Sequence, residues 1–267
     1  MKKIFIGFLA LLTANSSFAQ DAADKKFQAG IVFGAGMNFQ DMSTKLVNNN
    51  GVGSDLLVGG NFNYMFNETI GITSGLEFEF SKVKFEPGNG SLYYYYNDSK
   101  ILAQDDIAEA SHIYSLTSRK QSMTYLTIPT MVIFRTNFIG YMRYFGKLGM
   151  RHGFLLGQNS TDEGSSRLLS DPTSSFAPMQ NSNMKASNEA LFYKGTIGIA
   201  GGAEWNFVGS TCLVAEIGFY YGITPLYYNR KNPYLATIDQ VGGVPQERFI
   251  SNAAKQSQLQ LKISFLF

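Results

Sequence analysis

Residues 27–40 of this 267-residue chain have the sequence FQAGIVFGAGMNFQ, in which apolar residues alternate with small or polar ones. One face carries the apolar residues Phe27, Ala29, Ile31, Phe33, Ala35, Met37 and Phe39. The other face carries glycine, glutamine and asparagine, with Val32 as the single exception. Because successive side chains of a β-strand point to opposite faces, this period of two predicts a strand with one apolar face.

The same alternation recurs along the rest of the chain. It is found in the seven segments 56–66, 70–81, 125–134, 143–156, 191–206, 212–222 and 258–267. Within residues 125–134, the apolar residues Tyr125, Met131 and Ile133 blur the pattern. Eight strands, each with one apolar face, predict an all-β fold.

The connections between these segments alternate strictly between short and long. The short ones are residues 67–69, 137–139 and 207–210, and the long ones are residues 41–55, 86–122, 158–189 and 225–254. Outer-membrane barrels combine short periplasmic turns with long extracellular loops. We therefore expect an eight-stranded antiparallel up-and-down transmembrane β-barrel in the outer membrane of a Gram-negative cell.

The N-terminus has the three parts of a secretory signal peptide. Two lysines precede an apolar stretch that is too short to cross a bilayer, and small residues then stand at positions −3 and −1 of a cleavage site. The pattern predicts an exported protein with a signal peptide at residues 1–19, cleaved before Gln20. The barrel domain is then expected at residues 20–267.

The composition excludes several classes of protein. A single cysteine rules out a disulfide framework and a zinc cluster of cysteines. Removing the two signal-peptide lysines from the 22 basic residues leaves 20, which balance the 20 acidic residues. We expect no nucleic-acid partner, because such a partner would require a basic face. No cofactor and no metal are expected either.

The apolar face of an eight-stranded barrel can point outward to lipid or inward, as in a soluble lipocalin-like cup. Glycine is the commonest residue of the polar face, and the interior of such a barrel is just wide enough to be filled by side chains. Large apolar side chains on every strand would overfill that interior. We therefore expect the polar face to line the lumen and the apolar face to contact outer-membrane lipid and lipopolysaccharide.

The lumen-facing positions carry both acidic and basic residues. We expect a charge network that comprises Glu77, Glu79, Lys147, Arg151, Lys194, Glu204, Glu216 and Lys262, with Arg135 and Arg143 on the same faces. Unpaired charges in a narrow lumen are costly, so pairing is expected, with Glu216 directly bound to Lys262 on the neighbouring strand. The favoured interpretation is a plug that fixes strand register. A proton or ion path is the alternative, and a large single-channel conductance would reveal it.

Two segments resemble those of known barrels. Residues 259–267 resemble the C-terminal signal of Gram-negative outer-membrane barrels, which implies that Phe265 and Phe267 act as an assembly signal for the barrel-assembly machinery. Residues 125–129, with the sequence YLTIP, resemble the Tyr-Leu-x-Ile-Pro motif of the PorT-type outer-membrane β-barrels of Bacteroidetes, which are small OmpA/OmpX-like barrels. A mature N-terminus at Gln20 also fits that family. For some members the family implies a role in protein secretion linked to gliding.

Pro129 lies inside one of the expected strands. Proline has no N–H group for the hydrogen-bond ladder, and a closed barrel has no edge strand that could accommodate it. We therefore expect an irregularity such as a bulge at Pro129, exposed to a neighbour or bent inward.

The chain has only two histidines, His112 in the second long loop and His152 on a strand. Ser111 stands beside His112, and the same loop carries the acidic residues Asp105, Asp106 and Glu109. A Ser-His-acid set would be a hydrolase site at the rim, but adjacent serine and histidine cannot readily form an in-line nucleophile and base. His152 falls on the lipid-facing side. We expect no catalytic residue and no enzyme activity.

The tyrosine run Tyr93–Tyr96 follows the third strand. It can form a stacking platform for sugars or a protein, or part of the outer aromatic belt, and we favour the belt. Any protein partner is expected at the long extracellular loops. The sequence predicts a non-enzymatic outer-membrane β-barrel with a structural or interaction role, as an accessory of a protein secretion or surface-assembly complex. A small solute or ion channel and a rim-sited outer-membrane hydrolase are the alternatives.

Overall fold

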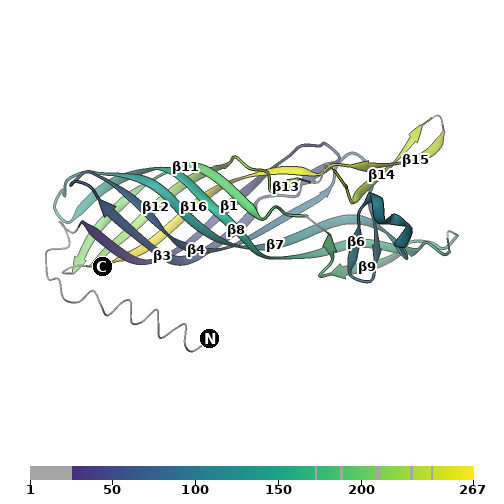
Figure 1. Cartoon of the computed structure of the whole chain (residues 1–267), viewed down its shortest axis with the longest axis horizontal. Helices are drawn as coiled ribbons and strands as arrows, with labels where there is room; N and C mark the ends of the chain where they lie inside the picture. The colour runs from purple at the N-terminus through teal and green to yellow at the C-terminus, as the bar shows by residue number, and fades with distance from the viewer. Residues whose placement is uncertain (1–25, 172, 187–188, 209–210, 229–230, 242) are drawn as a thin grey trace, which may run out of the picture.

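The computed structural model describes residues 26–267 except 172, 187–188, 209–210, 229–230 and 242. Its main strands are β1 (Phe27–Met42), β3 (Gly53–Met65), β4 (Ile70–Pro87), β7 (His112–Arg135), β8 (Met142–Leu168), β11 (Tyr193–Val208), β12 (Thr211–Gly222) and β16 (Ala253–Leu266). Each pairs antiparallel with its neighbours, and β1 pairs with both β3 and β16, which closes the ring (Figure 1). The expected eight-stranded barrel is confirmed. The expected signal peptide, residues 1–19, lies outside the described residues.

The two faces of the barrel wall follow the alternation of the sequence. Outward side chains such as Leu148, Ile199 and Leu261 are more than half exposed. Side chains of the other parity, such as Glu79 and Gln258, are fully buried in the lumen. A barrel that exposes its apolar face and buries its polar face has the arrangement required of a wall surrounded by lipid.

Three side chains that blurred the pattern of β7 point into the lumen. Tyr125, Met131 and Ile133 are at most 3% exposed. Their parity is that of the lumen face, so the strand alternates regularly and only the chemical type of its inward residues is unusual. These apolar residues help to fill both ends of the lumen.

The strand around Pro129 keeps its register but loses part of its ladder. Pairing of β4 with β7 runs from Ile70↔Phe134 to Ser74↔Thr130 and resumes at Glu77↔Thr127 without a shift. On its other side, Pro129 pairs regularly with Arg151 of β8. The irregularity expected at Pro129 is therefore present as an interrupted ladder with β4 and not as a bulge. The two register shifts of β7 against β8 lie elsewhere, between Leu116 and Ser118 and between Thr124 and Tyr125.

Several main strands run far beyond the length needed to cross a bilayer. A transmembrane β-strand needs about 9–11 residues, whereas β7 has 24 and β8 has 27. The long connections add β2 (Val47–Asn49), β5 (Leu92–Asn97), β6 (Lys100–Leu102), the 3₁₀ helix η2 (Gln104–Glu109), β9 (Ala177–Ser182), β10 (Lys185–Ala186), β13 (Tyr227–Tyr228), β14 (Leu235–Val241) and β15 (Val244–Ile250). None of the described helices is long and apolar enough to span a membrane. We call these added elements, with the parts of β4, β7 and β8 that pair with them, the distal extension (Figure 1).

The distal extension has a hydrophobic core of its own. The core consists of Val47, Phe85, Leu92, Tyr94, Tyr96, Ile101, Tyr114, Leu116, Met184, Tyr234, Leu235 and Ile250. Because β5 alternates, Tyr94 and Tyr96 enter this core while Tyr93 and Tyr95 face outward, half-buried. The interpretation of the run as an outer aromatic belt is wrong for Tyr94 and Tyr96, because side chains buried in a core cannot face the membrane interface.

Candidate functional site

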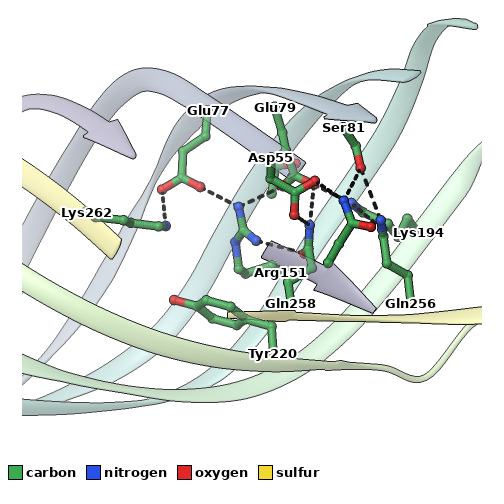
Figure 2. A network of polar contacts seen from close by, with 12 residues as sticks. Asp55, Glu77, Glu79, Ser81, Arg151, Lys194, Tyr220, Gln256, Gln258 and Lys262 are labelled. Atoms are coloured by element: carbon green, nitrogen blue, oxygen red, sulfur yellow. Dashed lines mark hydrogen bonds and ion pairs between the residues drawn. The ribbon is translucent and has the colours of Figure 1, made fainter. Parts of the chain in front are cut away.

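The centre of the lumen is organised by one arginine. Arg151 of β8 is 1% exposed and donates to Glu77 at 2.8 Å and to Glu79 at 2.9 Å, both on β4 (Figure 2). Its guanidinium lies 4.8 Å from the ring centre of Tyr220. That ring lies against the wall at Gly198, where a Cβ would stand 2.4 Å from Tyr220 Cδ1. The small residue thus makes room for the tyrosine that supports the arginine.

Each of the two glutamates also has a lysine from another strand. Lys262 of β16 donates to Glu77 at 2.8 Å. Lys194 of β11 donates to Glu79. Three strands that are not neighbours of β4 therefore supply its cations, and the ion pairs tie opposite walls of the barrel together (Figure 2).

The other predicted charges pair along the wall and toward the short turns. Lys147 of β8 donates to Glu216 of β12 at 2.6 Å across β11, where Ala200 is opposite Lys147 and Gly202 is opposite Glu216. Glu204 lies 2.5 Å from Arg143 and 3.9 Å from Arg135. All of the charged residues assigned to the lumen by parity thus lie in ion pairs inside it.

The expected direct pair of Glu216 with Lys262 is wrong. The two residues are opposite in register. Glu216 nevertheless pairs with Lys147, and Lys262 pairs with Glu77. Side chains on the concave face of a small barrel converge on the axis, so a long lysine reaches the opposite wall as easily as its neighbour.

Neutral and acidic residues that sequence reasoning left out complete the network. Asp55 of β3 accepts hydrogen bonds from Asn38 at 2.8 Å and from Gln258 at 2.7 Å (Figure 2). Gln258 also donates to Glu79 at 2.8 Å. Asp55 was missed because the strand was expected to begin at residue 56. Extending the parity of β3 by one residue would have placed it in the lumen.

Apolar side chains close both ends of the network. Toward the short turns they are Met65, Ile133, Phe145, Cys212, Val214 and Leu266. Toward the distal extension they are Val83, Met123, Tyr125, Leu226, Tyr227 and Ala254. A small cavity lies between the network and the first cluster, lined by residues such as Asn61 and Glu204, with room for about one water molecule.

A second group of charges lies inside the distal extension. Arg119 of β7 is fully buried and bonds both oxygens of Asp162, at 2.6 and 2.7 Å, and Glu189 at 2.6 Å. Its guanidinium lies 5.2 Å from the ring centre of Tyr94, which donates to Asp162 at 2.8 Å. Although burial opposes its charge, the carboxylates of Glu189 and Asp162 hold the pKa of Arg119 above its ordinary value. Sequence reasoning missed this group because its residues fall in connections taken for loops.

The hydrogen-bond partners of the two histidines are hydroxyl groups. The Ser111 hydroxyl lies 2.8 Å from Nδ1 of His112, and the His112 ring stacks on Tyr96. His152 faces outward and lies 2.8 Å from the Tyr193 hydroxyl. Within the described residues, neither histidine has a hydrogen bond or ion pair with a carboxylate. The same residues hold no group of three or more His, Cys, Asp or Glu side chains placed to bind a metal.

The C-terminal aromatic residues end the barrel wall. Phe265 and Phe267 have the outward parity of β16 and are 39% and 44% exposed. The N–H of Phe267 donates to the carbonyl of Ala29 at 2.8 Å, which continues the pairing with β1 to the last residue. Their role as an assembly signal stays a prediction.

A family model described as an outer membrane protein beta-barrel domain matches residues 18–228. The chain belongs to this family. Its membership places the protein in the outer membrane. In barrels of this kind the short turns face the periplasm and the long loops face the cell exterior. The finer resemblance to PorT-type barrels of Bacteroidetes stays a prediction, as does the division into a signal peptide and a mature domain.

Comparison with solved structures gives outer-membrane barrels at low identity. The chain is similar to the attachment invasion locus protein Ail of Yersinia pestis, with 12% identity over 91% of this chain and 100% of that one and a TM-score of 0.32. It is similar to OprG of Pseudomonas aeruginosa, with 11% identity over 90% and 95% and a TM-score of 0.39. It is also similar to the outer-membrane protease OmpT of Escherichia coli, with 9% identity over 94% and 99% and a TM-score of 0.31. No curated protein matches the sequence. These likenesses are too distant to carry an argument about function.

Proposed function

We propose that this outer-membrane protein is a non-enzymatic interaction protein, in which the barrel is the anchor and the distal extension binds a protein partner. The observation that carries the proposal is the buried core of the extension, which joins β5 and β14 to the projecting ends of β4 and β7. A second core beyond the membrane gives the extracellular part a fixed shape. Fixed shape lowers the entropy that is lost on binding a partner.

One face of the extension has the composition of a protein-binding surface. Tyr95 and Phe249 are half-buried, with ring centres 6.4 Å apart, and Tyr93 and Phe176 are 6.3 Å apart. Arg167 lies 4.9 Å from the ring centre of Phe176. Aromatic residues and arginine are the residue types that contribute most to protein–protein binding. We call these five residues the aromatic face.

The narrower role that we propose is that of an accessory to a protein secretion or surface-assembly complex. The test is affinity purification of the native protein from outer membranes in mild detergent. A stoichiometric partner is expected with the wild type and lost with Tyr95→Ser/Phe249→Ser. The control variant Val52→Ser/Val244→Ser removes two exposed apolar side chains elsewhere on the extension and should retain the partner. Recovery of the wild-type chain alone would contradict the proposal.

The other two functions have less support. A channel requires an open lumen, whereas Arg151, Lys194 and Lys262 bridge opposite walls of this one. Large single-channel conductance in a planar bilayer would favour the channel. A rim hydrolase would use His112 or His152, and in the part of the chain that the structure describes neither is hydrogen-bonded to a carboxylate. Lipid or peptide hydrolysis that is lost in His112→Ala would favour the hydrolase.

A further inference from the structure

The outward face of β3, β4, β7 and β8 changes from apolar to polar and basic side chains between two neighbouring rows of residues. Leu56, Phe80, Thr124 and Gly157 are direct neighbours in register, and the row below them includes Val58, Phe78 and Leu126. The next row toward the cell exterior is Ser54, Lys82, Ser122 and Asn159, all exposed. The row after it is Lys84, Lys120 and Thr161. This step from apolar to polar and basic side chains is the change expected where lipid chains end and headgroups begin.

Three lysines gather at that level on neighbouring strands. Lys84 stands directly opposite Lys120, and Lys82 is two residues nearer the membrane on the same face of β4. Like charges directly opposite each other destabilise a strand pair. An anion that binds between the ammonium groups would reduce this repulsion.

The nearest carboxylates lie behind the lysines, on the side away from the membrane. Glu163 is opposite Ser118, one row farther out than Lys120, and lies 3.2 Å from the Lys120 ammonium. Glu86 is two residues farther out than Lys84 and accepts from Asn50 at 2.5 Å. The two carboxylates therefore lie on the outer side of the lysine cluster. On its membrane side, the rows described above contain only hydroxyl, amide and apolar side chains.

We propose that Lys82, Lys84 and Lys120 bind the phosphate groups of a glycolipid in the outer leaflet. Lysine binds phosphate as a point charge, and the hydroxyls of Ser54 and Ser122 flank Lys82 as hydrogen-bond donors. The acyl chains of such a lipid lie against the row that contains Leu56 and Phe80, whose apolar side chains are exposed. The position of the lysines on the outer wall, directly above that row, favours a membrane lipid over a soluble anion. The proposal is independent of the partner proposed for the aromatic face.

The experiment uses the full-length protein in phosphatidylcholine nanodiscs. The probe is a diphosphorylated lipid A glycolipid, and its dephosphorylated form is the matched ligand control. Binding is counted by native mass spectrometry for the wild type, Lys82→Gln/Lys84→Gln/Lys120→Gln and Lys100→Gln/Lys185→Gln/Lys255→Gln. The second variant removes the same number of exposed lysines elsewhere. Heat-modifiable migration on a gel verifies that each variant is folded.

The proposal expects the wild type and the control variant to bind the diphosphorylated lipid, with affinity at least about tenfold lower for the lysine-cluster variant. The dephosphorylated lipid should bind equally weakly to all three proteins. Inorganic phosphate at millimolar concentration should leave the lipid bound. Unchanged affinity of the lysine-cluster variant, equal binding of the dephosphorylated lipid by the wild type, or displacement by inorganic phosphate would each overturn the proposal.

Discussion

The lumen of the barrel and the core of the distal extension differ in how their buried carboxylates are paired with cations. In the lumen, Glu77 and Glu79 share Arg151, and each has a lysine of its own. In the extension, Asp162 and Glu189 depend on Arg119 alone for an ion pair within the described residues. The lumen is thus a redundant polar network, whereas the described part of the extension is an aromatic core around one buried cation, Arg119. Loss of one cation should therefore affect the two regions to different degrees.

The largest effect is expected for Arg119→Met. The substitution leaves two carboxylates buried without a partner cation, and such a loss destabilises by about 3–5 kcal/mol. The extension should become sensitive to added protease while the barrel keeps its heat-modifiable migration. Arg167→Met, at a half-buried arginine of the same extension, is the matched control and should stay resistant. Equal resistance of Arg119→Met would contradict the role given to Arg119.

A smaller effect is expected for Arg151→Met in the lumen. Glu77 keeps its ion pair with Lys262 and Glu79 keeps its ion pair with Lys194. The free energy of unfolding should therefore fall by less than about 3 kcal/mol. The measurement is the temperature at which the barrel unfolds in detergent. The redundancy of the network would be wrong if Arg151→Met destabilised the barrel more than Arg119→Met destabilises the extension.

Tyr94→Phe should have a still smaller effect on the extension. The substitution keeps the ring that stacks near Arg119 and removes the hydroxyl bonded to Asp162 and Asn181. A buried hydrogen bond to a charged group contributes about 1.5–3 kcal/mol, and Asp162 keeps both bonds from Arg119. We therefore expect the free energy of unfolding of the extension to fall by an amount near the lower end of that range, as measured by denaturant unfolding. A loss as large as that of Arg119→Met would show that the hydroxyl, rather than the cation, holds the core.

The smallest effect is expected at the exposed pair of Lys120 and Glu163. Hydrogen bonds from Lys120 and Ser118 lower the pKa of Glu163 from its ordinary value of 4.5. Because the folded pKa is the lower one, the stabilisation is present above pH 4.5 and is lost as the pH falls through the lowered pKa. Lys120→Gln should leave thermal stability at pH 7 nearly unchanged, since exposed pairs contribute little. A marked loss at pH 7 would mean that the lysine cluster has a structural role.

The barrel itself could be predicted from the sequence because its signal is local. A period of two over eight segments fixes the face of each side chain, and the alternation of short and long connections fixes the topology. The extension could not be predicted in the same way. The run 92–97, for example, has tyrosine on both faces of β5, so no alternation of polarity marks it as a strand.

The members of the lumen network could be predicted, but their partners could not. Parity places Lys147, Glu216 and Lys262 on the inner face from local sequence alone. Which of them meet depends on the barrel shear and on the reach of each side chain across the axis, and neither is encoded in neighbouring residues. Arg119 was missed for a different reason, because it lies in the connection 86–122, where no alternation assigned its side chain to an inner face.

The most direct test of this account is hydrogen–deuterium exchange of the protein in lipid nanodiscs. The account holds that the part outside the membrane is folded around its own core. The amides of β5 and of residues 112–120 in β7 should then be protected for hours, like those of β16 in the barrel wall. Exchange of residues 92–97 and 112–120 within seconds, beside a protected β16, would contradict the central claim.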